Sequence, residues 1–342
     1  MNNKFNFLYL LLVLLTLGAC GDDDDDATAS PPRDRGEQQI LDNDSLVGYL
    51  ETHYYNSSFF NGNTNPSMDD IIISELPTDE NGNYLALPDP ENNTLLIDAV
   101  ETRSTVYEET DYTYYILRIN QGGGDETPNF PDNIRINYKG NTQDEEVFDS
   151  TVNPVLLDLS TLVPGWRRVL PEFNTAEMFI LNQDGTVDFT NAGVGVMFLP
   201  SGLGYFSGGA IGINPYSNLI FRFEFYQTEV NDHDFDNIPS YLEDLNDDLD
   251  LLNDNTDEDV FPNYEDIDDD GDGVLTRLED LEPDTDLNDD ADGDGDPTND
   301  IGDGDPTNDD SDGDGVPNYL DEDDDCSNAV DEDQNGIPDC DE

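Results

Sequence analysis

Basic residues are scarce in this chain. Its 342 residues include 11 Lys and Arg against 82 Asp and Glu, which gives a formal net charge of -71. Proteins that bind nucleic acid usually present a basic face, so this class of partner is excluded. Anionic lipid headgroups would repel the same charge, and any membrane attachment must therefore have another source.

Histidine and cysteine are also rare. The chain contains two histidines, His53 and His233, and three cysteines. Transition-metal sites in proteins are built mainly from clusters of these two residue types, and the sequence offers no such cluster. A bound metal is therefore expected to be one that prefers oxygen ligands.

Long apolar runs are confined to the first twenty residues. Lys4 supplies a positive end, and the run from Phe7 to Leu17 is too short for a comfortable membrane span, a pattern typical of an export signal. The run ends in Leu17-Gly18-Ala19-Cys20, which resembles the lipobox of bacterial lipoproteins. The resemblance implies that residues 1–19 are removed and that Cys20 carries a lipid, a membrane anchor. A plain secretory signal with an incidental cysteine is the alternative.

An acidic tether follows this cysteine. Gly21 and the aspartates Asp22 to Asp26 lead into residues 27–39, so that residues 20–39 have the composition of a solvated segment. A similar acidic run sends some Gram-negative lipoproteins to the outer leaflet. We therefore expect a protein anchored by its lipid to the outer membrane of a Gram-negative bacterium, either periplasmic or surface-exposed. A simple spacer is the alternative explanation of the acidic run.

From Ile40 the composition becomes globular. Asp44 to Leu50 predicts a short helix capped at Asp44 or Ser45, and Tyr112 to Asn120 predicts the first strand of a sheet. We expect residues 40–104 to form an extension packed on the domain that follows. Nothing in this extension indicates chemistry.

The stretch from Tyr138 to Phe221 carries the most specific pattern. Its motifs are Tyr138-Lys139-Gly140, Val147-Phe148-Asp149-Ser150, Leu162-Val163-Pro164-Gly165-Trp166, Leu199-Pro200-Ser201-Gly202-Leu203-Gly204-Tyr205, and Ile213 to Phe221. The apolar side chains lie on short strands and loop edges, where they could line a pocket as well as fill a core. In order and spacing the motifs resemble an FKBP-type peptidyl-prolyl cis-trans isomerase over residues 105–230. The resemblance implies an α+β fold in which a twisted antiparallel sheet wraps on a short helix, with a proline pocket between them.

The resemblance also assigns roles to individual positions. It implies that Trp166 is the pocket floor, that Asp149 is the polar wall, and that the Val163 backbone donates to the substrate carbonyl. Tyr205 would donate its hydroxyl at the rim. The implied walls are Tyr138, Phe148, Val155, Ile213 and Phe221, and Leu162 is a further apolar member of the set. The chain departs from the family where no arginine between Ser150 and Pro154 pairs with Asp149, and where Phe206 stands in place of the usual glycine.

Such a pocket suits the chemistry of proline isomerisation. Rotation about an X-Pro bond breaks amide resonance and meets a barrier of about 18–20 kcal/mol. An apolar pocket that favours the twisted amide lowers this barrier without a nucleophile, a general base or a cofactor. Neither His53 nor His233 lies in the central stretch, which agrees with this mechanism. The alternative is that the aromatic residues are ordinary sheet core.

Asp, Asn and Gly dominate residues 231–342. Without neutralisation this acidic tail would repel itself into disorder. Asp268 to Glu279 nevertheless matches a calcium loop, with alternating oxygen ligands followed by a glycine, an apolar residue and a final carboxylate. The predicted ligands are Asp268, Asp270, Asp272, Val274 and Glu279; Asp310, Asp312, Asp314, Val316 and Asp321; Asp331, Asp333, Asn335 and Glu342; and, in a looser copy with Asn237 in place of glycine, Asp232, Asp234, Asp236 and Glu243.

Calcium is the expected ion because it accepts many flexible carboxylate and carbonyl ligands. A solvated acidic tail without metal is the alternative. The pattern resembles type 3 thrombospondin repeats, in which the chain winds around a file of calcium ions with little apolar core or regular secondary structure. Cys326 and Cys340 bracket the last loop and fit that resemblance as a disulfide; two free thiols are the alternative.

We therefore predict a peptidyl-prolyl cis-trans isomerase that acts on exported or surface polypeptides and carries structural calcium in its tail. Its partners would be proline-containing polypeptides, with the membrane held through the lipid alone. A binding module that keeps the fold without the catalysis is one alternative, which a proline-peptide assay would reveal. A calcium-stiffened surface adhesion protein is another, and it should lose its partner in a pulldown with chelator.

Overall fold

The computed structural model describes residues 31–279 and 315–322 of the chain. Two compact units are present, residues 1–33 and 34–342, and the fold below is that of the second. None of the helices in the described part is long and apolar enough to cross a membrane. The signal peptide, Cys20, most of the last two predicted calcium loops, and both Cys326 and Cys340 lie outside the described residues.

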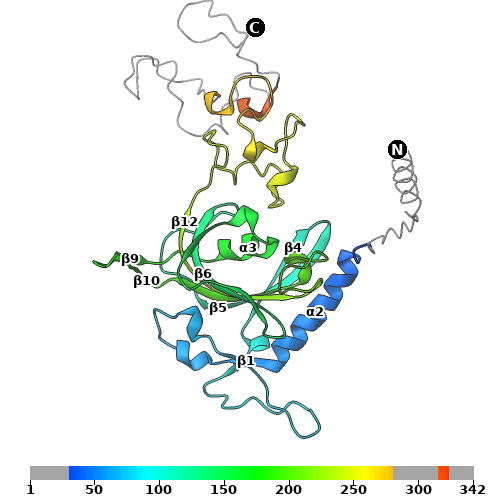
Figure 1. The fold of residues 1–342 in the computed structure, drawn as a ribbon, viewed down its shortest axis with the longest axis vertical. Helices are drawn as coiled ribbons and strands as arrows, with labels where there is room; N and C mark the ends of the chain where they lie inside the picture. The colour runs from blue at the N-terminus through cyan, green and yellow to red at the C-terminus, as the bar shows by residue number, and fades with distance from the viewer. Residues whose placement is uncertain (1–30, 280–314, 323–342) are drawn as a thin grey trace, which may run out of the picture. The chain divides into compact units, whose positions relative to one another are not determined.

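An antiparallel sheet of seven strands forms the centre of the fold (Figure 1). Its strand order is β4-β5-β11-β12-β6-β7, and β8 pairs with β6. The strands are β4 (Glu101–Tyr107), β5 (Thr110–Asn120), β6 (Asn133–Thr142), β7 (Val147–Ser150), β8 (Val155–Asp158), β11 (Gly193–Leu199) and β12 (Leu219–Glu229). The chain is thus a sheet-rich α+β protein with few helices, as the sequence predicted.

The two faces of this sheet build two separate apolar clusters. Along β5, Tyr114 and Ile116 belong to one cluster while Tyr115 and Leu117 belong to the other. Successive side chains of a strand point to opposite faces, so this alternation places the clusters on opposite sides of the sheet. The central strands are therefore covered on both faces, and each cluster has its own helix.

The helix on the first face is short. α3 (Pro164–Val169) begins with proline, whose fixed φ suits the first helical turn and whose missing N–H costs nothing there. Trp166 and Val169 join the cluster that contains Tyr114 and Ile116. The 3-10 helices η4 (Leu159–Thr161) and η5 (Leu170–Glu172) flank α3.

The second face is covered by residues 34–100. α2 (Arg35–Thr52) packs Leu46 and Leu50 into the cluster that contains Tyr115 and Phe198. A small sheet with the order β2-β1-β3 follows, as do 3-10 helices; their bounds are β1 (His53–Tyr55), β2 (Ile73–Glu75), β3 (Thr94–Leu95), η1 (Ser57–Phe60), η2 (Met68–Asp70) and η3 (Leu96–Asp98). Figure 1 shows α2 and α3 as separate helices on different sides of the central sheet.

Two boundaries predicted from the sequence were wrong. The first helix begins at Arg35 rather than near Asp44, so it takes up residues assigned to the tether. The Asp34 side chain caps it by accepting a 2.9 Å hydrogen bond from the Glu37 backbone N–H. The central sheet begins with β4 at Glu101, before the strand that was expected to start it.

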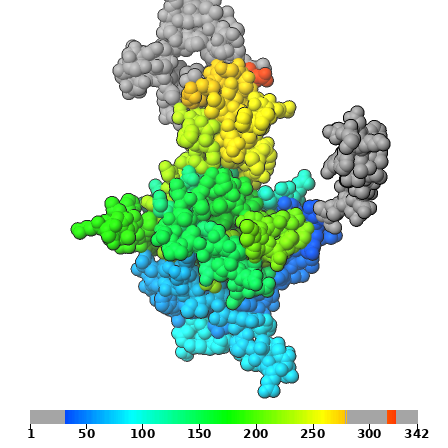
Figure 2. Space-filling model, viewed as in Figure 1, coloured from blue at the N-terminus to red at the C-terminus, as the bar shows by residue number. Residues whose placement is uncertain are grey.

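A hairpin leaves the central sheet between α3 and β11. It consists of β9 (Met178–Leu181) and β10 (Val187–Thr190), and Figure 2 shows it projecting from the surface. Every residue of β9 is exposed although all are apolar. Sequence analysis missed this hairpin, for which Asp184-Gly185 between two apolar runs was the available signal.

Beyond β12 the described residues contain neither α-helix nor strand. Their regular elements are 3-10 turns, η7 (Leu251–Asn253), η8 (Asn263–Glu265), η9 (Thr276–Leu278) and η11 (Asn318–Leu320). His233 links this segment to the central domain, since its ring Nε2 lies 3.1 Å from Asp158 Oδ2. Arg167 makes a second link by donating to the Leu249 carbonyl at 2.7 Å.

Candidate functional site

A hollow of about 140 Å³ opens between α3 and the strands β6, β7 and β12. Its lining residues come from the sheet, the η4–α3 segment and the loop after β11: Tyr138, Phe148, Asp149, Leu157, Thr161, Leu162, Val163, Trp166, Tyr205 and Phe221. Ligand pockets for drug-sized molecules are commonly about 300–1,000 Å³, so this hollow suits a single side chain. It is therefore of the size that recognition of one small ring requires.

Trp166 forms the base of the hollow. Only 3% of the residue is exposed, yet it belongs to the hollow's lining. Its ring centroid lies 5.7 Å from that of Tyr138 and 5.0 Å from that of Phe221, in edge-on and tilted contacts. Such contacts fix the plane of the indole. The indole is thus held in place by its neighbours and still meets the hollow.

Gly140 makes room for two of the aromatic walls. A Cβ built on this glycine would lie 2.6 Å from the Phe148 ring and 2.7 Å from the Phe221 ring. The two rings meet edge to face with their centroids 5.5 Å apart. The Tyr138-Lys139-Gly140 motif therefore contributes to the hollow in two ways. Tyr138 is one of its walls, and Gly140 leaves room for the Phe148 and Phe221 rings.

Asp149 is held without an arginine. Its Oδ2 accepts a 2.5 Å hydrogen bond from the Tyr138 hydroxyl, and its Oδ1 accepts one of 2.8 Å from the Ser150 backbone N–H. Burial, and next the bond to Asp149, raise the pKa of Tyr138 above its ordinary range. The phenol therefore stays protonated at neutral pH and acts as the donor to Asp149. Tyr138 is therefore a hydrogen-bond donor to Asp149, for which the sequence provides no arginine.

Tyr205 lies at the mouth of the hollow and is 42% exposed. The next residue, Phe206, has φ of +44°, a region that favours glycine. Its ring is held edge-on by Tyr216, at 5.2 Å between centroids, and lies under the Arg35 guanidinium at 4.4 Å. The backbone conformation thus matches the glycine that the family resemblance implied, while the phenylalanine ring ties the loop to α2.

Most of the predicted pocket residues are brought together. The exceptions are Val155, which packs against the core, and Ile213, which is buried in it. Leu157 and Thr161 line the hollow but were not predicted. Alternation along β8 was the available signal for Leu157, because Val155 and Leu157 lie on one face of that strand. The lining contains no histidine, cysteine or lysine, so the arrangement suits binding of an apolar group and hydrogen bonding to it.

Where it is described, the acidic tail has left-handed backbone at the sixth position of three predicted loops. Asn237, Gly273 and Gly315 occupy the glycine position of three predicted loops, and their φ angles are +81°, +102° and +100°. Asparagine adopts this left-handed region more readily than most residues. The looser copy at residues 232–243 therefore has the turn that its sequence allowed.

Three groups of carboxylates gather in the described part of the tail. One is Asp268, Asp270 and Asp272, as predicted; the Glu279 carboxylate of the same loop is not a member of it. A second contains Asp234, Asp236 and Glu243 together with Asp269, whereas the predicted ligand Asp232 is not included. The third, Asp257, Asp259 and Asp266, was missed by sequence analysis, for which the Asp257-x-Asp259 spacing was the only signal.

In the second group, the pKa values of Glu243 and Asp269 are strongly raised. Burial, and then the charge of Asp269, raise the pKa of Glu243 to about 10. Burial, and then the charges of Asp236 and Asp234, raise the pKa of Asp269 to about 10. Of the last two predicted loops, only residues 315–322 are described, which include Val316 and Asp321; their other predicted ligands lie outside the described residues.

Comparison with known proteins gives one family match, in the tail. The family model described as BamM C-terminal matches residues 233–288, well under half of the chain. None of the curated proteins matches.

Two solved structures are similar to the chain over 38% of its length. One is a peptidyl-prolyl cis-trans isomerase from Pseudomonas syringae pv. tomato str. DC3000, with 19% identity, 81% of that protein covered and a TM-score of 0.30. The other is FkpA from Escherichia coli, with 24% identity, 52% of that protein covered and a TM-score of 0.30.

Proposed function

We propose that the protein is a peptidyl-prolyl cis-trans isomerase that acts on X-Pro bonds of exported or surface polypeptides. The observation that carries this proposal is the hollow beside Trp166, which is lined by most of the residues that the motif pattern selected. A hollow of about 140 Å³ with an indole base and aromatic walls suits a prolyl ring.

In the proposed mechanism, the hollow stabilises the amide while its C–N bond is twisted. The prolyl ring rests on Trp166, so the ring is fixed while the preceding carbonyl rotates. Twisting removes amide conjugation, and an apolar surrounding with few competing donors favours that state over the planar one. The Tyr205 hydroxyl, at the mouth, donates to the peptide, and the Val163 backbone N–H donates to its carbonyl. Asp149 orients Tyr138 and supplies the polar wall.

Activity of the full chain on a proline-containing peptide tests this proposal. Trp166→Ala should reduce the rate nearly to that of the uncatalysed reaction, because it removes the base of the hollow. Loss of a buried aromatic side chain also lowers stability by about 3–5 kcal/mol, so folded protein must be verified by circular dichroism.

Phe173→Ala is the matched control. Phe173 is fully buried in the same cluster, with its ring 4.9 Å from that of Phe223, but it does not line the hollow. It should therefore lose similar stability and keep its activity while folded. Equal activities of the two folded variants would contradict the proposal. Peptide binding without any rate acceleration by the unmodified chain would favour a binding module instead.

We also propose that the tail binds calcium and that a lipid on Cys20 anchors the protein to the outer membrane. The tail proposal is supported by the left-handed φ of Asn237 and Gly273 and by the gathering of Asp268, Asp270 and Asp272. Cys20 lies outside the described residues, so the anchor rests on the Leu17-Gly18-Ala19-Cys20 pattern alone.

A further inference from the structure

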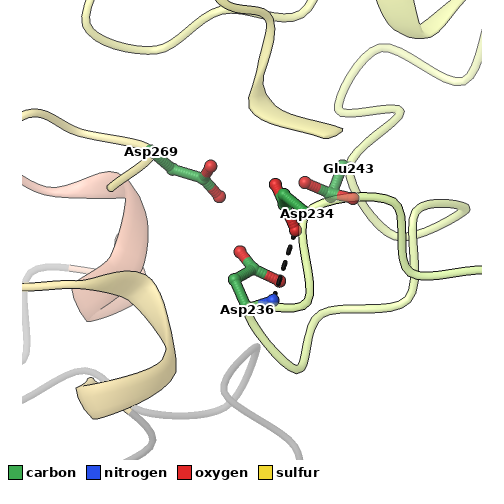
Figure 3. Close-up of side chains that lie close together, drawn as sticks. All are labelled: Asp234, Asp236, Glu243 and Asp269. Atoms are coloured by element: carbon green, nitrogen blue, oxygen red, sulfur yellow. Dashed lines mark hydrogen bonds between the residues drawn. The ribbon is translucent and has the colours of Figure 1, made fainter. Parts of the chain in front are cut away.

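The carboxylate group in the tail that is most buried does not follow the predicted loop pattern. Asp234, Asp236 and Glu243 come from one predicted calcium loop, and Asp269 comes from another (Figure 3). In the loop pattern Asp269 stands between two ligand positions, Asp268 and Asp270, and is not itself a ligand. Its place in this group therefore comes from the fold.

These carboxyl groups are buried and therefore need a positively charged partner. Glu243 is fully buried, and Asp236 and Asp269 are each 1% exposed. Both carboxylate oxygens of Glu243 and both of Asp269 lack a hydrogen-bond partner, as do Asp234 Oδ2 and Asp236 Oδ2. Burying several carboxyl groups with neither a hydrogen-bond partner nor a counter-charge is among the most unfavourable arrangements in a protein. The unpaired oxygens consequently indicate a cation at their centre.

Hydrogen bonds within the loop use one carboxylate oxygen of Asp234 and one of Asp236, and leave the other oxygen of each for a cation. Asp234 Oδ1 accepts from the Asp236 backbone N–H, and Asp236 Oδ1 accepts from the Ile238 backbone N–H at 2.8 Å. Their Oδ2 atoms remain for a ligand. Figure 3 shows the Asp269 carboxylate facing Asp234 and Asp236 from a separate segment of the chain.

We propose that Asp234, Asp236, Glu243 and Asp269 form a calcium site that clamps residues 232–243 to residues 266–279. One oxygen from each residue lies within 4.8 Å of the others. Calcium–oxygen distances give a coordination shell roughly 4.6–5.2 Å across, so these oxygens can surround one calcium ion with little rearrangement. The ligands are all oxygen, as a hard cation requires.

The loop around Asp269 then serves two ions. Asp268, Asp270 and Asp272 gather as one group, while the intervening Asp269 reaches the other. The Asp269 backbone is fixed from within the loop, because its N–H donates to Thr276 Oγ1 at 3.0 Å. An ion bound by Asp268, Asp270 and Asp272 would order this loop and present Asp269 to the clamp site. Binding at the two sites is therefore expected to be cooperative.

Calcium titration of the full chain by calorimetry tests the clamp site, with Asp269→Asn as the perturbing variant. It should bind one calcium ion fewer, or bind that ion with affinity lowered by at least the roughly 10–100-fold that loss of a supporting residue produces at metal sites. Glu258→Gln is the control, because Glu258 is exposed and belongs to none of the described carboxylate groups. It should match the unmodified chain.

Hydrogen exchange of the unmodified chain and of Asp269→Asn gives a second test. Calcium should protect residues 232–243 and 266–279 together, and chelator should expose both. In Asp269→Asn, calcium should still protect residues 268–273 but no longer protect residues 232–238. Unchanged stoichiometry and affinity in Asp269→Asn, or calcium protection of only one segment in the unmodified chain, would overturn the proposal. These measurements do not depend on isomerase activity.

Discussion

The rim hydroxyl of Tyr205 offers the sharpest separation of catalysis from folding. Tyr205 is 42% exposed at the mouth of the hollow, so replacing it by phenylalanine removes a hydroxyl and leaves the packing in place. If that hydroxyl donates to the peptide during rotation, its loss removes a neutral hydrogen bond worth about 0.5–1.5 kcal/mol. At about 1.36 kcal/mol for each tenfold change in rate, kcat/KM should fall about 2- to 13-fold.

The assay compares kcat/KM of full-length Tyr205→Phe and Tyr84→Phe on the same proline peptide. Tyr84 is similarly exposed, at 48%, and its hydroxyl donates to Glu75 Oε1 at 2.7 Å, away from the hollow. Tyr84→Phe controls for the loss of one exposed hydroxyl and should leave kcat/KM unchanged. Urea unfolding should give midpoints for both variants close to that of the unmodified chain. If Tyr205→Phe is as active as Tyr84→Phe, the reasoning that places Tyr205 in the mechanism is refuted.

Two further predictions concern the walls and the link to the tail. Gly140→Ala should lower activity and cost about 1–3 kcal/mol of stability, because the added methyl group would clash with the Phe148 and Phe221 rings. Gly48→Ala is the control: nothing lies within 4 Å of its added methyl group, so activity in the same peptide assay should be kept. Burial opposes ionisation of Asp158, but its hydrogen bonds with His233 and Ser160 outweigh this effect and hold its pKa below the ordinary 3.8. A carboxyl with a lowered folded pKa contributes stability above its unfolded pKa and loses it as the pH falls through the folded value. Asp158→Asn should therefore cost about 1–2 kcal/mol in urea unfolding at pH 7, and this difference should shrink well below pH 3.8; a difference independent of pH would contradict the role of the charge.

The sequence allowed the hollow to be predicted because its residues are tied to local motifs. Trp166 follows Pro-Gly at the start of α3, and Tyr138 and Gly140 lie close together on one strand. Val155, predicted as a wall, packs against the core, whereas Leu157, on the same strand, lines the hollow. The sequence shows which residues share a face of a strand but not how far along it a cavity extends.

Other features depend on contacts between distant segments and were not predictable. Asp269 belongs to the group of Asp234 because two loops come together, and the residue spacing within either loop does not predict that contact. The start of α2 was placed too late because the apolar pattern begins after it, whereas Asp34 provides a polar cap. Tyr138 took the expected place of an arginine beside Asp149, since a hydroxyl from the neighbouring strand reaches the carboxylate.

The alternation of side chains through the central sheet also decides where the protein can be cut. Tyr115, Leu117 and Phe198 turn toward α2 and its neighbours, on the side away from Trp166. A shortened protein that begins near residue 105 would lack most of β4 and would expose these apolar side chains to solvent. Such an exposed apolar surface promotes aggregation. Residues 34–100 thus keep one face of the central strands out of water, and a shorter folded fragment has to include them.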